Sequence, residues 1–287
     1  MQRTPVVSVI TPCLNAARFL EDTIQSVLEQ DYPEIEYLVI DGGSTDGTLE
    51  ILRSHGGRLT YFSSSDFGAA DAINKGFRKA RGDVVAWLNA DDTYLPGAVS
   101  KAVKALEDNS EAAAVYGEGY WTRSGGEILG RYPTTPCALP GLARECCICQ
   151  PTCFVRREAV EAVGFLNPSL RTSFDYDLWI RLAKRYRFVH IPEYLATSRM
   201  HPENKTLGQR RTVFTESISV LMQHFGYVPV SWIYGYLSFL SDRRDQFFEP
   251  LRNSILVYLL ALPVGLGYNY AHPAKYIAEW MSAVKRS

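Results

Sequence analysis

Four aspartates of this 287-residue sequence lie at or near the ends of expected strands: Asp41, Asp66, Asp91 and Asp92. Any one of them suits a turn or the start of a helix, because aspartate is common in both. Together they would converge on one crevice, and converging carboxylates repel unless a cation or a donor-rich ligand lies between them. A divalent metal bound to a diphosphate meets this requirement, so the pattern predicts a metal and diphosphate site.

The run Asn89-Ala90-Asp91-Asp92 follows a strongly apolar stretch and precedes a turn at Leu95-Pro96-Gly97. It resembles the Asp-x-Asp signature of sugar-nucleotide transferases, with Asn in the place of the first Asp. Hard oxygen ligands suit Mg²⁺ or Mn²⁺, and a metal that bridges two phosphates stabilises the charge on a leaving diphosphate. We therefore expect Asp91 to be the leading metal ligand and Asp92 to be its neighbour.

Short apolar runs rich in β-branched residues precede these polar groups. Such runs occupy residues 6–11 and 84–88, and a third ends at residues 39–41. Their length and composition predict buried strands of a parallel sheet. Ligands bind outside the carboxyl ends of the strands in open sheets of this kind, so the polar residues at these strand ends mark the expected binding edge.

The stretches between the expected strands have helical spacing. Apolar residues recur at i, i+4, i+7 and i+8 from Leu20, after a candidate N-cap at Asn15. A second helix is expected to start after Ser44 and to reach Arg53, with Asp46 in its first turn, where a negative charge favours the helix dipole. Alternating strands and helices predict right-handed crossovers and a sheet with helices on both faces.

The later part of the chain is predicted to be helical. Apolar stripes at helical spacing occupy residues 175–187 and 214–225. Aromatic residues crowd together after Gly226, where the composition changes. We therefore expect one α/β domain at residues 1–225 and a C-terminal helical extension at residues 226–287.

Within the extension, residues 254–270 are uncharged and mostly apolar. A stretch of about 17 residues is at the short limit for a membrane span, and Pro263, Gly265 and Gly267 interrupt its second half. A spanning helix is therefore disfavoured. We expect either a buried helical hairpin or a surface that contacts a membrane or a second subunit.

Composition limits the partners and the compartment. With 30 basic and 31 acidic residues the formal net charge is -1, so charge-driven recognition must be local, and nucleic acid is not an expected partner. The N-terminus lacks the apolar region of a signal peptide, which predicts a cytoplasmic protein, with the inner face of the membrane as a further site. Five of six cysteines lie between Cys137 and Cys153 with no histidine nearby, which favours buried or idle thiols over zinc.

A series of motifs runs through the first two thirds of the chain. In order they are Val7-Ser8-Val9-Ile10-Thr11-Pro12, Val39-Ile40-Asp41-Gly42-Gly43-Ser44, Ser65-Asp66-Phe67-Gly68, Asp71-Ala72-Ile73-Asn74-Lys75-Gly76, Ala80-Arg81-Gly82-Asp83 and Asn89 to Asp92. Their order and spacing resemble family 2 glycosyltransferases over roughly residues 6–205, and an ordered series is more specific than any single motif. The resemblance implies a GT-A type fold, a mixed and mostly parallel sheet flanked by helices.

The resemblance also implies roles in the donor half. Thr11 and Pro12 are expected to line the base pocket, Asp41 to hydrogen-bond the pyrimidine, and Asp66 to lie near the nucleotide and the sugar. The structural alternatives are a strand end for Pro12 and a solvated helix charge for Lys75. The set expected to bind the donor is Thr11, Pro12, Asn15, Asp41, Asp66, Asp71, Lys75, Asn89, Ala90 and Arg199.

The segment Arg199-Met200-His201, followed by Asn204-Lys205, resembles the mobile loop that closes over the donor phosphates in this family. Positive side chains there would offset diphosphate charge, and His201 is expected to reach the metal or a phosphate. A lone loop histidine is also common without such a role. The expected metal set is Asp91, Asp92 and His201, with Mn²⁺ or Mg²⁺ as the ion.

The segment Ser173-Phe174-Asp175-Tyr176-Asp177-Leu178-Trp179 resembles the Glu-Asp-Tyr-Asp-Leu-Trp form of these enzymes, and Gln150-Pro151 resembles the region before it. Direct displacement at an anomeric carbon requires the acceptor hydroxyl to lose its proton during attack. We expect Asp175 to be the base, with Phe174 lowering local polarity and raising its pKa. Asp177 is expected to cap backbone N–H groups.

An inverting, non-processive glycosyltransferase explains all of these motifs. It would move one sugar from a nucleoside-diphosphate sugar, preferably a UDP-sugar, to a hydroxyl of a glycan or lipid-linked saccharide, as in polysaccharide biosynthesis. A sugar-phosphate nucleotidyltransferase should show a basic, Gly-rich N-terminal loop, which residues 11–15 lack. A non-catalytic nucleotide-sugar or glycan-binding protein would tolerate loss of Asp91 or Asp175, and both are present. The chain has no Gln-x-x-Arg-Trp segment, which disfavours a processive synthase.

Overall fold

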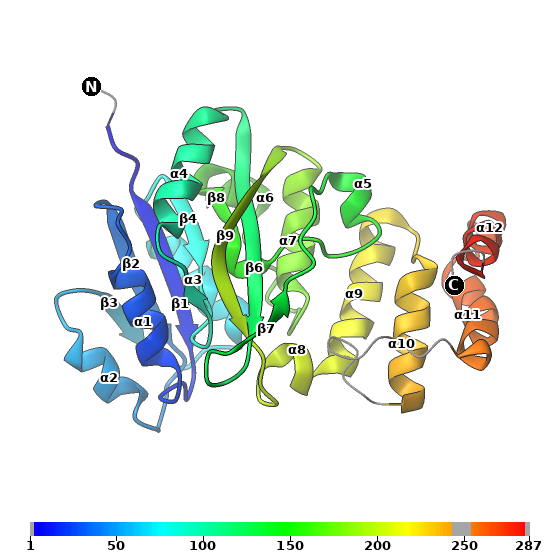
Figure 1. Cartoon of the computed structure of the whole chain (residues 1–287), viewed down its shortest axis with the longest axis horizontal. Coiled ribbons are helices and arrows are strands. Elements are labelled where there is room, and N and C mark those ends of the chain that lie inside the picture. The colour runs from blue at the N-terminus through cyan, green and yellow to red at the C-terminus, as the bar shows by residue number, and fades with distance from the viewer. Residues whose placement is uncertain (1–2, 243–253, 285–287) are drawn as a thin grey trace. The chain divides into compact units, whose positions relative to one another are not determined.

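The computed structural model describes residues 3–242 and 254–284, and the chain divides into two compact units (Figure 1). Unit 1 runs to Leu139 and resumes at Cys147–His201. Unit 2 comprises Pro140–Cys146 and the chain from Pro202. The division expected at residue 225 falls inside unit 2.

The strands of unit 1 form one mixed sheet in the order β3-β2-β1-β4-β8-β6-β9-β5, with β7 paired to β6. The β1–β2, β1–β4, β2–β3 and β6–β9 pairs are parallel, and the β4–β8, β6–β8, β6–β7 and β5–β9 pairs are antiparallel. The bounds are β1 Val7–Cys13, β2 Ile35–Asp41, β3 Thr60–Ser63, β4 Val84–Trp87, β5 Thr93–Tyr94, β6 Ala112–Thr122, β7 Ile128–Arg131, β8 Phe154–Arg156 and β9 Arg187–Arg199.

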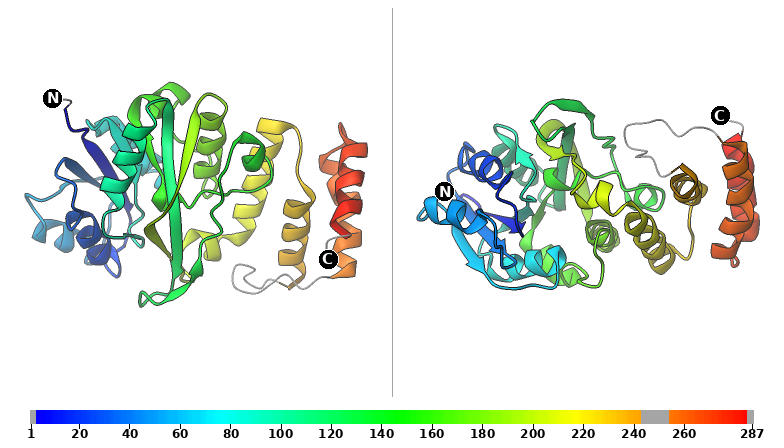
Figure 2. Two further views of the ribbon diagram at one scale, coloured as in Figure 1. Left: turned by 45° about the horizontal axis from the view of Figure 1, so that its top comes forward. Right: turned by 90° about the horizontal axis from the view of Figure 1, so that it is seen from below.

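Helices flank both faces of this sheet (Figure 2). On one face the residues of α1, α2 and α4 share a buried core with Val7, Val9 and Val39. On the other face Trp87 of β4 packs between Phe77 of α3, at 5.9 Å, and Trp179 of α7, at 5.3 Å. The bounds are α1 Leu20–Leu28, α2 Thr48–Ser54, α3 Ala69–Lys79, α4 Ala98–Asp108, η1 Gln150–Thr152, α6 Arg157–Val163 and α7 Phe174–Ala183. The short helix α5, Leu139–Leu142, begins at the last residue of the first segment of unit 1 and continues into unit 2.

The Asn74-Lys75-Gly76 motif holds α3 to its surroundings. A Cβ on Gly76 would overlap Ile10 of β1, so only glycine permits this close approach. Buried Asn74 donates to the Leu166 carbonyl over 2.9 Å and accepts from the Leu166 N–H over 3.0 Å. These two residues of the motif therefore stabilise the fold beside the site.

Two helix starts differ from the expectation. Asn15 is not the cap of α1, which begins at Leu20 with Phe19 at its N-cap position. Asn15 instead adopts a left-handed conformation with φ of 51° and leads the chain away from β1. Asp46 lies before α2 rather than in its first turn, and its carboxylate accepts from the N–H of Thr48, the first helical residue, over 3.0 Å.

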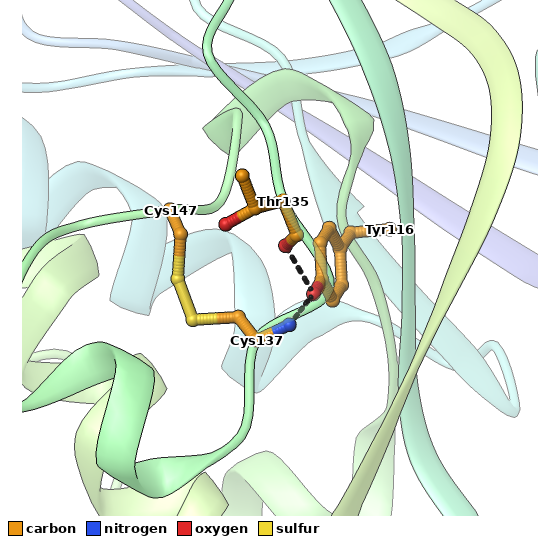
Figure 3. The surroundings of a disulfide bond; sticks show 4 residues. All are labelled: Tyr116, Thr135, Cys137 and Cys147. Carbon is orange, nitrogen blue, oxygen red and sulfur yellow. Dashed lines mark hydrogen bonds between the residues drawn. A yellow bond between two sulfur atoms is a disulfide. The ribbon is translucent and has the colours of Figure 1, made fainter.

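Cys137 and Cys147 form a disulfide (Figure 3). The expectation of idle thiols is therefore wrong for this pair, because the fold brings the two ends of the 137–147 segment together. The Tyr116 hydroxyl also holds the start of this segment in place. It donates to the Thr135 carbonyl over 2.9 Å and accepts from the Cys137 N–H over 2.7 Å. Burial raises the pKa of Tyr116 to about 12, so this hydroxyl stays protonated. Cys149 and Cys153 are buried and lie outside this disulfide, as expected.

Unit 2 is helical. Asn269 ties its parts together, because its side chain accepts from the Val228 N–H over 2.8 Å and donates to the Val228 carbonyl over 3.0 Å. In the described residues, 3–242 and 254–284, every helix is too short or too polar to cross a bilayer. The bounds are α8 Lys205–Gly208, α9 Arg210–Phe225, α10 Val230–Asp242, α11 Ile255–Tyr268 and α12 Pro273–Val284.

Candidate functional site

The expected site residues gather at one edge of the unit 1 sheet. β1, β2, β3 and β4 are parallel, so their carboxyl ends lie at the same edge. β6 and β9 end there too, because both run antiparallel to β8, which itself runs antiparallel to β4. The loops after β1, β2, β3, β4 and β9 therefore meet at this edge, as the sequence predicts.

Asp41, at the end of β2, organises the turn that follows it. Its carboxylate accepts from the N–H groups of Gly43 and Ser44, each over 3.1 Å, and from the hydroxyls of Ser44 and Ser63 over 2.5 and 2.6 Å. Burial alone would raise the pKa of Asp41, but these hydrogen bonds outweigh it and hold the pKa below its ordinary value. The carboxylate is therefore charged, and its oxygens accept hydrogen bonds from neighbouring residues of the protein.

The loop after β1 is fastened to that turn. Asn15 donates its N–H to the Ser44 hydroxyl over 2.7 Å, and its side chain accepts from the Thr45 N–H over 2.9 Å. Thr11 is fully buried, with its hydroxyl 3.1 Å from that of Tyr37, and Pro12 is also buried. The β1 side of the expected base pocket thus presents backbone and the exposed residues that follow Cys13.

Asp66 and Asp71 brace the loop between β3 and α3. Asp66 accepts from the Gly68 N–H over 2.8 Å, and a Cβ on Gly42 would lie 2.6 Å from the other Asp66 oxygen. Gly42 is therefore required for Asp66 to approach the end of β2. Asp71 accepts from the Phe67 N–H over 3.2 Å and pairs with Lys75 at 3.3 Å.

Asp91 and His201 meet at the centre of the edge. His201 Nε2 lies 3.0 Å from Asp91 Oδ2, and the side chains are 7% and 26% exposed, respectively. Two ligands of one octahedral ion, each about 2.1 Å from it, are separated by about 3 Å. Here the two side chains are hydrogen-bonded to each other directly, and the same separation suits two neighbouring ligands of a Mn²⁺ or Mg²⁺ ion.

Asp92, by contrast, points into the protein. It is 3% exposed, and its two oxygens accept from the Arg199 N–H over 2.9 Å and from the Asn89 amide over 3.1 Å. Burial, and then the neighbouring Asp91, raise the pKa of Asp92 well above its ordinary value. The structure therefore places Asp92 between the end of β4 and the end of β9, behind the pair of Asp91 and His201.

Phe19 and Asp22 of the α1 region belong to the site, although no sequence motif marks them. His201 packs on the Phe19 ring with centroids 4.8 Å apart, and the Arg199 guanidinium lies 4.6 Å from the same ring. Arg199 also pairs with Asp22 at 3.0 Å. Arg199 is only 6% exposed and shares the Phe19 ring with His201.

Gln150 is a further residue of the site, signalled by the Gln150-Pro151 motif. Its amide donates to the Trp87 carbonyl over 2.8 Å, and its oxygen accepts from the Asn89 amide over 3.1 Å. Asn89 thus stands where a first carboxylate is common, but it bridges Gln150 and Asp92. Ala90 is 8% exposed and contributes backbone between them.

Asp175 lies in the first turn of α7, beside the same edge. Trp179, one turn further along α7, stacks on Trp87 two residues before Asn89, and α7 leads down to the start of β9 at the opposite edge. Asp175 therefore lies one turn of α7 before Trp179, toward the carboxyl edge. Buried Asp177 pairs with the Arg181 guanidinium at 2.8 Å, one turn further along α7.

Two further features bear on the site. Among the residues that the structure describes, no group of three or more His, Cys, Asp and Glu side chains is arranged to hold a metal. A cavity of about 350 Å³ lies at the amino ends of β1 and β4, lined by Pro5, Asp83 and Val84 among others. It is at the edge opposite the aspartates.

A mixed sheet with helices on both faces and polar side chains gathered at the carboxyl ends of its strands defines an α/β protein whose ligand site is expected at that edge. The model of Glycosyl transferase family 2 matches residues 8–164, which is more than half of the chain, so the chain belongs to that family.

Relatives and solved structures agree with this assignment. A glycosyltransferase of Rickettsia felis is 31% identical over 69% of this chain but is covered over only 35% of its own length. The putative teichuronic acid biosynthesis glycosyltransferase TuaG of Bacillus subtilis is 29% identical over 73% of this chain and 86% of its own. The chain thus spans about a third of the Rickettsia felis relative and most of TuaG.

Two solved structures share the fold. TarS 1–349 of S. aureus in complex with UDP has a TM-score of 0.59 at 16% identity, covering 95% of this chain and 91% of that chain. The mannosyltransferase PcManGT of Pyrobaculum calidifontis, in complex with GDP-Man and Mn²⁺, has a TM-score of 0.58 at 22% identity, covering 96% of this chain and 76% of that chain. The fold is therefore of the GT-A type, as the motifs predict.

Proposed function

We propose that this protein is an inverting, non-processive glycosyltransferase that transfers one sugar from a nucleoside-diphosphate sugar to an acceptor hydroxyl. The observation that carries the proposal is the convergence of Asp91 and His201 at 3.0 Å on the edge where Asp41 organises a turn. UDP bound to TarS and GDP-Man bound to PcManGT support a nucleotide-sugar donor, and we favour a UDP-sugar.

The metal would be held by Asp91 and His201. The Mn²⁺ that is bound together with GDP-Man in PcManGT supports Mn²⁺ as the ion, and Mg²⁺ has a similar preference for oxygen ligands. When bound, the ion supplies positive charge against the diphosphate that leaves. Asp92 lies behind this pair, where it holds the Arg199 N–H and the Asn89 amide and so fixes the two ligands.

The donor would lie over the loops after β1, β2 and β3. The turn after Asp41 and the loop that Asn15 fastens to it offer backbone donors and acceptors for a base and ribose. A direct bond from Asp41 to a pyrimidine N–H requires one of its present donors to give way. Lys75, bonded to Asp71 and to the Ser65 carbonyl, holds the loop that carries Asp66.

Asp175 would accept the proton of the acceptor hydroxyl as that oxygen forms its bond to the anomeric carbon and the bond to the diphosphate breaks. Its place in the first turn of α7, beside buried Phe174, supports this role. We propose a glycan or lipid-linked saccharide as the acceptor, because the relative TuaG is named for teichuronic acid biosynthesis. A cytoplasmic location, at the inner face of the membrane, is the setting predicted from the sequence.

A screen of nucleotide sugars for metal-dependent hydrolysis tests the proposal, because slow hydrolysis of a donor needs no acceptor. We expect one UDP-sugar to be hydrolysed with Mn²⁺ and not with EDTA. The matched control is Asp108→Asn, which changes an exposed carboxylate of α4 and should leave hydrolysis unchanged. Absence of hydrolysis and of nucleotide-induced thermal stabilisation with every donor and metal would overturn the proposal.

A further inference from the structure

Arg18 is an exposed cation at the carboxyl edge of the sheet, and the proposed mechanism does not use it. It lies in the loop after β1, two residues before Leu20, where α1 begins. Its guanidinium lies over the Phe19 ring, 4.7 Å from the centroid. In the parts of the chain that the structure describes, no carboxylate pairs with it. A guanidinium that is stacked on a ring in this way keeps its N–H donors available for a ligand.

The acidic residues nearest to Arg18 in the sequence have other partners. Glu21 and Asp22 lie in the first turn of α1, but Glu21 pairs with His55 and Asp22 pairs with Arg199, each at 3.0 Å. A cation at the amino end of a helix faces the positive end of the helix dipole, so its position is unfavourable unless an anion lies close to it. The surroundings of Arg18 therefore favour an anionic ligand.

The Phe19 ring connects Arg18 with the proposed metal ligands. The His201 ring lies 4.8 Å from the Phe19 ring, centroid to centroid, and His201 pairs with Asp91. Arg18 and His201 are therefore neighbours around one aromatic ring. A diphosphate on an ion held by Asp91 and His201 would be within reach of the Arg18 guanidinium.

Hydrogen bonds fix the backbone that leads to Arg18. The Ala16 N–H donates to the Thr48 hydroxyl over 2.9 Å, and the Ala17 N–H donates to the Asp46 carboxylate over 3.0 Å. Both bonds fasten this loop to the segment after β2, where the base and ribose are proposed to lie. Because the loop is fixed and the guanidinium is stacked, less conformational entropy is lost when Arg18 binds a ligand.

The cations that the sequence predicted for the donor are less available. Lys75 pairs with Asp71 at 3.3 Å and donates to the Ser65 carbonyl over 2.9 Å, and Arg199 is buried. A guanidinium also matches phosphate oxygens with two parallel N–H donors. We infer that Arg18 binds the diphosphate of the nucleotide donor. This inference rests on the proposed function, and it adds a residue that no motif marked.

Binding of UDP and of uridine to the full chain with Mn²⁺ tests the inference, because only UDP carries the diphosphate. Calorimetry measures UDP affinity, and nuclear magnetic resonance titration measures uridine affinity. We expect Arg18→Ala to bind UDP about tenfold more weakly than the wild type and to bind uridine equally well. Arg18→Glu should bind UDP more weakly still, because its carboxylate repels the diphosphate.

The matched control is Arg53→Ala, which removes the exposed guanidinium of α2 that pairs with Glu50. It should bind UDP and uridine like the wild type. The thermal midpoints of the Arg18 and Arg53 variants should also match that of the wild type, because both side chains are exposed.

The possible failures are distinguishable. A wild type that binds no nucleotide would overturn the proposed function together with this inference. If the wild type binds UDP and Arg18→Ala binds it equally well, the inference alone is wrong. Equal losses of UDP and uridine affinity in Arg18→Ala would assign Arg18 to the shape of the loop instead of the diphosphate. An Arg18→Glu variant that binds UDP as well as Arg18→Ala would also contradict the inference, because a charge-based contact must respond to reversal of the charge.

Discussion

The loops after β2 and β4 place aspartates at the same edge of the sheet but use them differently. Asp41 after β2 accepts four hydrogen bonds, three from its own turn and one from Ser63. After β4, Asp92 is buried and bonded inside the protein, while Asp91 stays partly exposed and meets His201. Burial and hydrogen-bond saturation therefore separate the carboxylates that hold the loops together from Asp91, which we propose to bind the ion.

The largest effect is expected from a change to Asp91, the partly exposed aspartate. Asp91→Asn removes the ligand charge, so metal-dependent donor hydrolysis should fall by about 10²- to 10³-fold. The thermal midpoint should change little, because the side chain is 26% exposed. Steady-state hydrolysis across a Mn²⁺ titration measures this. A near-normal rate at saturating Mn²⁺ would show that Asp91 is not the ligand.

Asp175 separates binding from chemistry within the site. Asp175→Asn keeps the size of the side chain but cannot take up the acceptor proton, so transfer should fall by about 10²-fold or more. Affinity for UDP with Mn²⁺ should be unchanged, unlike that of Asp91→Asn. Transfer assays and calorimetry on both variants test the contrast. If Asp175→Asn transfers sugar normally, the base lies elsewhere.

Asp92→Ala tests the aspartate of the β4 loop whose two oxygens are hydrogen-bonded inside the protein. Removal of this carboxylate leaves the Arg199 N–H and the Asn89 amide without the acceptor that they share, at a cost of about 2–4 kcal/mol in the free energy of unfolding. Urea unfolding at neutral pH measures it. Asp108→Ala, at an exposed ion pair with Lys104, should cost less than about 1 kcal/mol. Equal costs would contradict a structural role for Asp92.

The turn after β2 should be sensitive to acid. Hydrogen bonds hold the pKa of folded Asp41 below its unfolded value of about 3.9. Its stabilisation is therefore fully present above about pH 4 and is lost as the pH falls through the folded pKa. At pH 6 the free energy of unfolding of the wild type should exceed that of Asp41→Asn by about 1–2 kcal/mol, and this difference should shrink below pH 4. A difference that stays constant down to pH 3 would contradict this.

Much of the fold followed from the sequence because its signals are local. Apolar runs at residues 6–11 and 84–88 became β1 and β4, and spacing from Leu20 became α1. The start of α1 was wrong, since Asn15 bonds to Thr45, thirty residues away, rather than to the helix. The disulfide between Cys137 and Cys147 was likewise not predicted, because it forms only when the fold brings the two ends of this segment together.

The motifs predicted the edge at which these residues gather, but they did not assign the roles within it. Adjacent Asp91 and Asp92 are alike in sequence, and only the partners that β9 supplies distinguish them. Phe19 and Asp22 support Arg199 and His201 through contacts that span most of the chain, so no local pattern marks them. Gln150 is intermediate, because a motif marks it while its bonds to Trp87 and Asn89 need the fold.

Calorimetric titration of UDP, with and without Mn²⁺, tests the central claim most directly. The account predicts that Mn²⁺ strengthens UDP binding to the wild type by at least about tenfold, because the ion links the diphosphate to Asp91 and His201. Asp91→Asn should lose this gain while keeping its weak affinity without metal. Equal UDP affinity with and without Mn²⁺, or a gain that persists in Asp91→Asn, would contradict the account.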